Sequence, residues 1–151
     1  MLATEILTED HEQAMSLVES LEGARSDERG HRETFRELKQ ALELHIREEE
    51  EIYYPALVEH GEFSDLMEEN VPEHEMVRAN LVQMSELSPA SDTFQSLLTE
   101  TRIALLAHMK HEEDEIFPRS IELLGEERIR ELGNEIDQLK GDAGISRSAT
   151  L

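Results

Sequence analysis

The chain has 151 residues, no cysteine and a formal net charge of −22 at pH 7. Its length fits one compact domain, and the lack of cysteine excludes disulfides, thiolate zinc sites, iron–sulfur clusters and thiol catalysis. So large an excess of acid repels nucleic acids and anionic membrane surfaces, and we therefore expect neither as a partner. Apolar residues make up 38% but include few aromatics and no tryptophan, which indicates a helical core of aliphatic side chains.

Apolar residues recur at helical spacing along nearly the whole chain, and the first half predicts a pair of helices. The first helix is expected at about 4–21 and the second at about 32–60, with a polar linker at 23–30 between them. Gly61 is expected to end the second helix, because glycine readily adopts the left-handed conformation that follows a helix.

The second half predicts another pair of helices. After one short helical turn within 63–69, a third helix is expected to start at 70–72, since proline is tolerated in a first turn, and to run to about Leu87. The segment 88–92 is the next turn, and a fourth helix is expected at about 93–124.

These elements predict an all-α fold: an antiparallel up-down four-helix bundle of two repeated αα-hairpins, with a short extra C-terminal helix. The bundle domain is expected at 1–140, and its last helix, 126–140, could cap the bundle or meet another subunit. The polar tail at 141–151 is expected to be flexible. Pro55 and Pro118 are expected to kink or end their helices, because each lacks an N–H group.

Four residues recur with a constant displacement of 63 positions: His11, His45, Glu49 and Pro55 return as His74, His108, Glu112 and Pro118. A histidine and a glutamate four residues apart share one helix face, so both can reach the same metal ion. Four imidazoles and two carboxylates from four helices suit two ions better than one, with an oxo, hydroxo or water bridge and an exogenous ligand completing the coordination. This ligand set favours iron among redox metals, and manganese and zinc stay open.

Three more side chains lie near this face. His111 follows His108 by three residues. Tyr53 lies one turn beyond Glu49, and Tyr54 is adjacent to Tyr53. A phenol close to ferric iron could coordinate it or donate a hydrogen bond to a bound ligand. These residues are candidates for an additional ligand or for contacts behind the ligands.

Two acidic runs, 48–51 and 112–115, surround the glutamates of the pattern. Most of their carboxylates are expected to face solvent, while some, with Glu48 as a candidate, could hold the ligand imidazoles from behind. The alternative for the six repeated residues is a set of hydrogen-bonded core histidines and solvated glutamates. Their register across both halves favours metal binding.

Four segments, LTEDHEQAM, LELHIREEEEIYYPAL, VPEHEMVRANL and LLAHMKHEEDEIFP, resemble those of hemerythrin-like HHE cation-binding domains, over about residues 4–124. The resemblance implies a four-helix bundle around a non-haem, oxo-bridged di-iron centre, with the six repeated histidines and glutamates as its ligands. Arg78 departs from the oxygen-carrying hemerythrins, which have a second histidine there. The set of four histidines and two glutamates resembles instead the branch that acts in iron-centre repair and nitric-oxide response.

The resulting hypothesis is a protein with two iron ions and a bridging oxo or hydroxo group, which binds or processes oxygen, peroxide or nitric oxide and takes electrons from an unidentified donor. One alternative is a module that binds, stores or senses iron or oxygen without turnover, and another is a purely structural bundle. The first residues show no signal peptide and no stretch is apolar enough to span a membrane, so a cytoplasmic location is expected. The oligomeric state is open.

Overall fold

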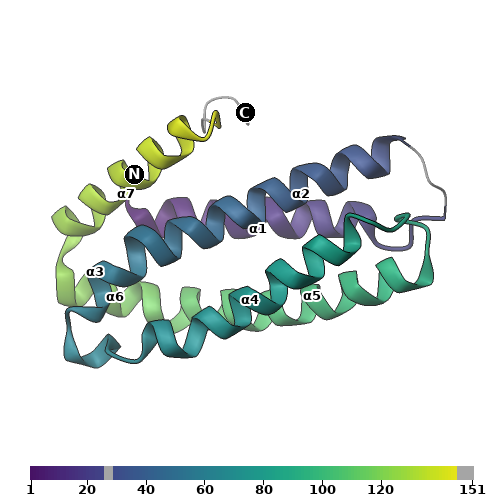
Figure 1. Cartoon of the computed structure of the whole chain (residues 1–151). Helices are drawn as coiled ribbons and strands as arrows, with labels where there is room; N and C mark the ends of the chain where they lie inside the picture. The colour runs from purple at the N-terminus through teal and green to yellow at the C-terminus, as the bar shows by residue number, and fades with distance from the viewer. Residues whose placement is uncertain (26–28, 146–151) are drawn as a thin grey trace.

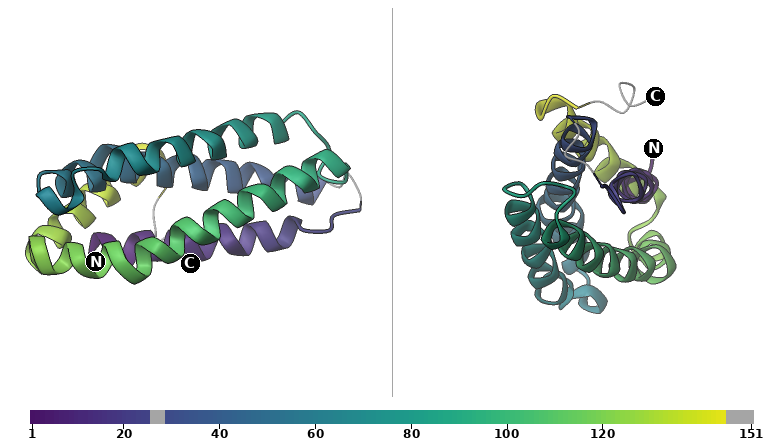
Figure 2. Two further views of the ribbon diagram at one scale, coloured as in Figure 1. Left: turned by 90° about the horizontal axis from the view of Figure 1, so that it is seen from below. Right: turned by 90° about the vertical axis from the view of Figure 1, so that its right-hand side faces the viewer.

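The computed structural model describes residues 1–25 and 29–145, and within them the chain is helical with no strand. Its long helices α1 (Ala3–Leu21), α2 (Arg29–Glu48), α4 (Leu66–Met84) and α5 (Asp92–His111) form a helical bundle (Figure 1). α1 packs against α2, and α4 against α5. The two views of Figure 2 show the same bundle from below and from one end. In this described part, no helix combines the length and the apolar character needed to cross a membrane.

α2 and α5 each continue through a widened π-helical turn into a short α-helix. These segments are η1 (Glu49–Tyr53), α3 (Tyr54–Val58), η3 (Glu112–Ile116) and α6 (Phe117–Leu124). Each π turn begins at a glutamate of the repeated pattern and ends two residues before its proline. The prolines therefore do not end the helices: a local widening precedes each one, and the helix goes on after it.

The prolines explain the widening. A proline inside an α-helix removes one hydrogen bond and its ring clashes with the carbonyl four residues earlier. Here the N–H of Tyr54, directly before Pro55, donates to the carbonyl oxygen of Glu49, five residues back. Phe117, directly before Pro118, donates to Glu112 in the same way. π turns of this kind are frequent at functional sites.

The expected start of the third helix at 70–72 is wrong, because α4 begins at Leu66 and contains Pro72. A 3₁₀ turn, η2 (Gly61–Phe63), precedes it. Leu66 is buried in the apolar core, which anchors the first turn of α4 ahead of the proline. The Asn70 side-chain amide also donates to the carbonyl oxygen of Leu66 at 2.7 Å, which adds a bond to the same turn.

α7 (Glu126–Asp142) follows a turn at Gly125, whose φ of 87° favours glycine. It packs on α1, α2, η1 and α6 of its own chain through the fully buried Ile129 and Ile136. α7 includes two residues of the expected tail at 141–151. Residues 146–151 of that tail lie outside the described residues.

The buried apolar side chains form two clusters along the bundle. One gathers around the ends of α3, α6 and α7, and the other fills the space between α1, α2, α4 and α5 nearer the opposite end. In α1 the boundary falls between Leu7, which belongs to the first cluster, and Ala14, which belongs to the second. His11 lies at that boundary, and a layer of buried polar side chains crosses the bundle there.

Candidate metal centre

This polar layer brings together all six residues of the repeated pattern. Each comes from a different element: α1, α2, η1, α4, α5 and η3 supply His11, His45, Glu49, His74, His108 and Glu112 respectively. Both glutamates are completely inaccessible to solvent, and the most exposed of the six side chains, that of His108, is only 9% exposed. Residues separated by up to 101 positions thus share one buried site.

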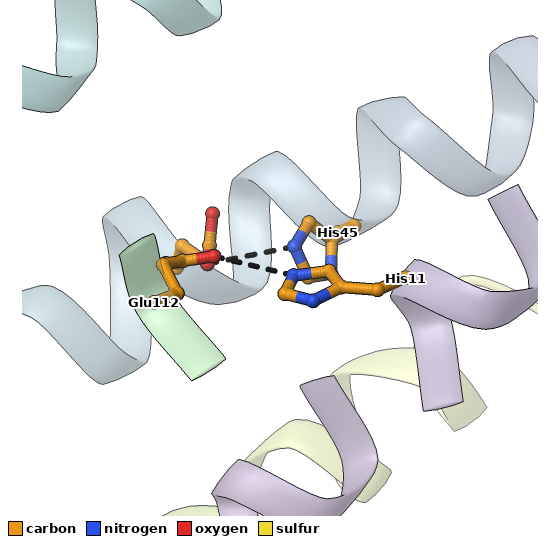
Figure 3. Close-up of side chains that lie close together, drawn as sticks. His11, His45 and Glu112 are labelled. Carbon is orange, nitrogen blue, oxygen red and sulfur yellow. Dashed lines mark ion pairs between the residues drawn. The ribbon is translucent and has the colours of Figure 1, made fainter. Parts of the chain in front are cut away.

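One half of the site is formed by the histidines of α1 and α2. His11 Nε2 lies 3.2 Å from Glu112 Oε1, and His45 Nε2 lies 3.4 Å from Glu49 Oε2. Figure 3 shows both imidazole rings turned toward the carboxylate of Glu112. Each of the four residues offers one ligand atom, and these atoms all lie within 4.8 Å of one another, close enough for a single ion to bind them.

The other half is formed by the histidines of α4 and α5. Glu49 Oε1 lies 3.2 Å from His74 Nε2 and 3.6 Å from His108 Nε2. Glu112 Oε1 in turn lies 3.4 Å from His108 Nε2. Both glutamates therefore contact histidines of both halves, which is the arrangement expected of carboxylates that bridge two ions.

A carboxylate holds each imidazole from behind, through its Nδ1 atom. The Nδ1–carboxylate distances are 2.7 Å for His11–Glu113, 2.7 Å for His74–Glu50, 3.0 Å for His45–Asp10 and 3.2 Å for His108–Glu73. An ionised carboxylate only accepts, so each Nδ1 carries a hydrogen and each Nε2 faces into the site, where its lone pair could bind a metal ion. Such contacts orient metal-binding histidines and raise their basicity.

These four carboxylates recur with the same displacement of 63 positions as the candidate ligands. Glu113 follows Glu50 by 63 positions, and Glu73 follows Asp10 by 63. The sequence interpretation pointed to the runs that contain Glu50 and Glu113 but missed the other two. Asp10 and Glu73 each directly precede a ligand-type histidine, and their common displacement is the signal that could have identified them.

The chemistry of the inward atoms fits a metal ion. Several of them are buried and lack a hydrogen-bond partner with suitable geometry: His11 Nε2, His45 Nε2, both carboxylate oxygens of Glu49, and Glu112 Oε1. Each buried polar atom without a partner costs about 1–3 kcal/mol. All are lone-pair donors of the kinds that bind iron, manganese or zinc, so a cation at their centre would offset that cost.

The pKa values of the buried residues are shifted by the charges that surround them in the site. Burial opposes ionisation of Glu49, yet the positive charge of His45 and the close approach of its other neighbours outweigh burial and hold the Glu49 pKa well below its usual value. Burial and the nearby Glu49 raise the Glu112 pKa to about 7. Burial lowers the His108 pKa, but Glu49 and Glu112 overcome this and raise it to about 9. The site thus holds protons that a metal ion would displace.

Of the two tyrosines, the structure places Tyr54 at the site. Its hydroxyl donates to Glu112 Oε2 at 2.8 Å and lies 3.2 Å from His108 Nε2. Burial and the charges of the two glutamates raise the Tyr54 pKa. The Tyr53 hydroxyl instead pairs with Ser120 Oγ at 2.7 Å. The π turn explains the difference. Because one turn of it spans five residues and not four, Tyr54, the fifth residue after Glu49, lies on the same face of the helix as Glu49.

The remaining two candidates lie behind or outside the ligands. His111 is not brought to the site: its side chain is 52% exposed and its Nδ1 pairs with Glu115. Three residues along an α-helix turn a side chain roughly 60° from the starting one, enough to move it to the outer face. Glu48 is completely buried beside Asp10 and Lys140, behind His45.

Arg78, which stands where oxygen carriers have a further histidine, acts on a ligand from behind. Its guanidinium bonds Glu50 Oε1 at 2.8 Å, and Glu50 holds Nδ1 of His74. It also pairs with Glu75 at the surface. Arg78 therefore supports one of the candidate ligands.

The comparisons agree with this geometry. The family model described as the hemerythrin HHE cation-binding domain matches residues 2–120. Comparison with curated proteins and with solved structures finds no significant match. The family match covers α1 through the first half of α6 and every one of the six inward residues. The chain therefore belongs to the hemerythrin family of HHE cation-binding domains.

Proposed function

We propose that this protein holds two iron ions, bridged by an oxo or hydroxo group, and that it binds or processes a small oxidant or diatomic ligand: oxygen, peroxide or nitric oxide. The family binds cations, and the buried groups of histidine and glutamate could hold them. The proposal includes the antiparallel up-down arrangement of the two repeated hairpins. Its ligands are His11, His45, Glu49, His74, His108 and Glu112.

One observation carries the proposal. Four imidazole Nε2 atoms converge on two completely buried carboxylates, and each imidazole is fixed from behind by its own carboxylate. A structural polar layer would satisfy its own atoms by mutual hydrogen bonds. Here five inward atoms, on His11, His45, Glu49 and Glu112, are left without such partners, while the outward Nδ1 atoms of all four histidines have them.

A small apolar pocket beside the ligands favours a small exogenous molecule. Its volume is about 20 Å³, room for one water-sized molecule, and its wall combines four site residues with aliphatic side chains: His45, Glu49, His74 and His108, with Leu42, Ile46, Val77, Leu105 and Met109. Such a pocket favours a ligand close to water in size over an organic substrate.

When bound, iron supplies reversible one-electron chemistry and open coordination positions. The protein residues orient the ligands, exclude bulk water and offer a hydrogen-bond donor. Tyr54 is that donor, since its hydroxyl lies between Glu112 and His108 and burial keeps it protonated. The position of Arg78 disfavours reversible oxygen carriage, because it leaves no fifth imidazole on α4.

The decisive experiment is metal analysis of the purified protein together with its optical spectrum. We expect about two irons per chain, with oxo-to-ferric charge-transfer bands in the near ultraviolet. Background metal content after anaerobic reconstitution with ferrous iron would overturn the proposal. Turnover of peroxide, measured against the metal-free protein, then distinguishes processing from binding without turnover.

A further inference from the structure

The strongest observation outside the ligands is a buried cluster where α7 meets α1 and α2. Lys140, on α7, is only 7% exposed, an unusual position for a lysine. Its ammonium lies 2.9 Å from Asp10 Oδ1 and 2.9 Å from Glu48 Oε2. The two carboxylates come from α1 and α2, so one cation joins three helices.

Asp10 connects this cluster to the candidate metal ligands. Its Oδ1 accepts from Lys140, while its Oδ2 accepts from Nδ1 of His45 at 3.0 Å. The opposite nitrogen of His45, Nε2, faces Glu49. An unbroken line of polar contacts therefore runs from α7 to the inward face of the site.

The packing of α7 fixes where this lysine lies. Ile129, Leu132 and Ile136 are buried at 0–1% exposure along one face of the helix. Gly133 brings α7 so close to the start of α1 that an added Cβ would collide with the Met1 carbonyl oxygen. Lys140 therefore reaches Asp10 from a helix that is packed closely on α1, which suits a side chain that positions others.

In the second half of the site Arg78 plays this part for His74 through Glu50, whereas His108, the repeat equivalent of His45, has no comparable support. Glu73, the repeat equivalent of Asp10, holds His108 at 3.2 Å but its side chain is 57% exposed, against 13% for Asp10. Within residues 1–25 and 29–145, no lysine or arginine lies within ion-pair distance of Glu73. The repeat equivalent of Glu48 is the exposed His111.

We propose that Lys140 is a positioning residue for His45. Its ammonium keeps Asp10 and Glu48 side by side and holds Asp10 in the orientation that fixes the His45 ring. Without it Asp10 Oδ1 loses the donor that fixes it from α7, and Asp10 is free to turn away from His45. This inference rests on the proposed function, and it makes α7, which lies beyond the matched residues 2–120, part of the metal centre. It also predicts that the half formed by His11 and His45 binds its ion more tightly.

The test compares Lys140→Met with Lys39→Met in the full chain. Lys39 is a matched control, because it pairs with Glu43 at 2.7 Å on α2. Stepwise anaerobic titration with Fe²⁺ measures the two binding steps. We expect Lys140→Met to weaken the tighter step by about tenfold or more, the range for residues that hold metal ligands from behind, and to leave the weaker step unchanged. The control should change neither step.

A second readout does not depend on metal. In the metal-free protein, the Nδ1–H proton of His45 should give a hydrogen-bonded signal in the nitrogen–proton spectrum, identified by its loss in Asp10→Asn. Lys140→Met should shift or broaden that signal and leave the signal of His108 in place. If wild-type protein binds no iron, the proposed function fails, and this spectrum still decides on the contact between Lys140, Asp10 and His45.

A double-mutant cycle separates positioning from mere docking of α7. If Lys140 acts through Asp10, Lys140→Met combined with Asp10→Asn should weaken the tighter binding step no more than Asp10→Asn alone. Additive losses, or a lower melting temperature with unchanged binding steps and an unchanged His45 signal, would overturn the inference. Lys140→Gln, which can still donate to Asp10 without charge, serves if the methionine variant does not fold.

Discussion

The two halves of the site share one design and differ in what surrounds it. In both, a carboxylate behind each imidazole turns Nε2 inward, and the rings of a pair meet edge to face with centroids 4.9 Å and 5.1 Å apart. Behind the rings the halves diverge. Phe117 stacks on His11, whereas its repeat equivalent Tyr54 stacks on His74 and adds a hydroxyl.

The charged partners differ as well. Lys140 and Glu48 bury the carboxylate that holds His45, while Arg78 supports His74 from a more exposed position. The repeat thus conserves the groups that would touch metal, and the asymmetry lies one contact further out. Two ions bound by equivalent ligands are expected to differ in affinity and in reactivity for that reason.

The largest effect is expected when both halves are disabled together. His45→Ala combined with His108→Ala removes one imidazole from each half and should reduce iron content to background. The loaded wild-type protein should melt at a higher temperature than its metal-free form, since binding to the folded state stabilises it. The double variant should show no such difference.

A matched control for this variant is His31→Ala with His60→Ala, since those histidines lie outside the repeated pattern. Metal content should stay at the wild-type level there. Full iron content in the variant of His45 and His108 would contradict the ligand assignment and would leave the layer as a structural feature.

The contrast between the halves is sharpened by two substitutions at equivalent positions. Asp10→Asn should reduce iron affinity by about 10–100-fold, because a buried carboxylate that fixes a ligand is lost. Glu73→Gln should have a smaller effect, because an exposed ion pair is worth little. Competition with a chelator measures both constants, and equal losses would refute the asymmetry.

Substitution of Gly133 tests the docking of α7 onto the first half. Gly133→Ala places a methyl group against the Met1 carbonyl oxygen and within 3.0 Å of the backbone nitrogen of Ala3. Overpacking against a backbone should lower the free energy of unfolding by about 1–3 kcal/mol, measured by urea denaturation.

The control for this substitution is Gly141→Ala in the same helix. Nothing lies within 4 Å of the added methyl there, so the higher helix propensity of alanine should leave the stability unchanged or slightly raised. If both variants lost the same stability, close packing at Gly133 would not be the cause.

Much of this site could be predicted from the sequence because the repeat carries it. A displacement of 63 residues identified the six residues that the structure brings together, and helical spacing located the long helices. Both inferences depend only on periodicity, which a single sequence contains. The beginning of α4 was misplaced, because the burial of Leu66 is a tertiary effect that outweighs the local preference of Pro72.

The choice between the two tyrosines could not be made from spacing alone. An α-helical count of four residues from Glu49 favours Tyr53, and only the π turn forced by the following proline brings Tyr54 to the site. Lys140 was likewise beyond reach, because its contact with Asp10 joins positions 130 residues apart with no repeat to signal it. Residues that make the two halves of the site differ, such as Tyr54 and Lys140, could therefore be assigned to the site only from the structure.

The smallest predicted effect concerns Tyr54, which distinguishes the second half from the first. Tyr54→Phe gives both halves a phenylalanine at this position and leaves Glu112 Oε2 without its donor at 2.8 Å. The loss should cost the metal-free protein about 1–3 kcal/mol of unfolding free energy. The visible or near-ultraviolet spectrum of the iron-loaded variant should change too, since the hydroxyl lies within reach of the ligands Glu112 and His108.

Tyr53→Phe is the matched control, because it removes a buried hydroxyl that pairs with Ser120 and should leave the spectrum unchanged. The same spectral change in both variants would show that the hydroxyl of Tyr54 has no special relation to the metal, and the asymmetry would then reside in the charged residues behind the imidazoles alone.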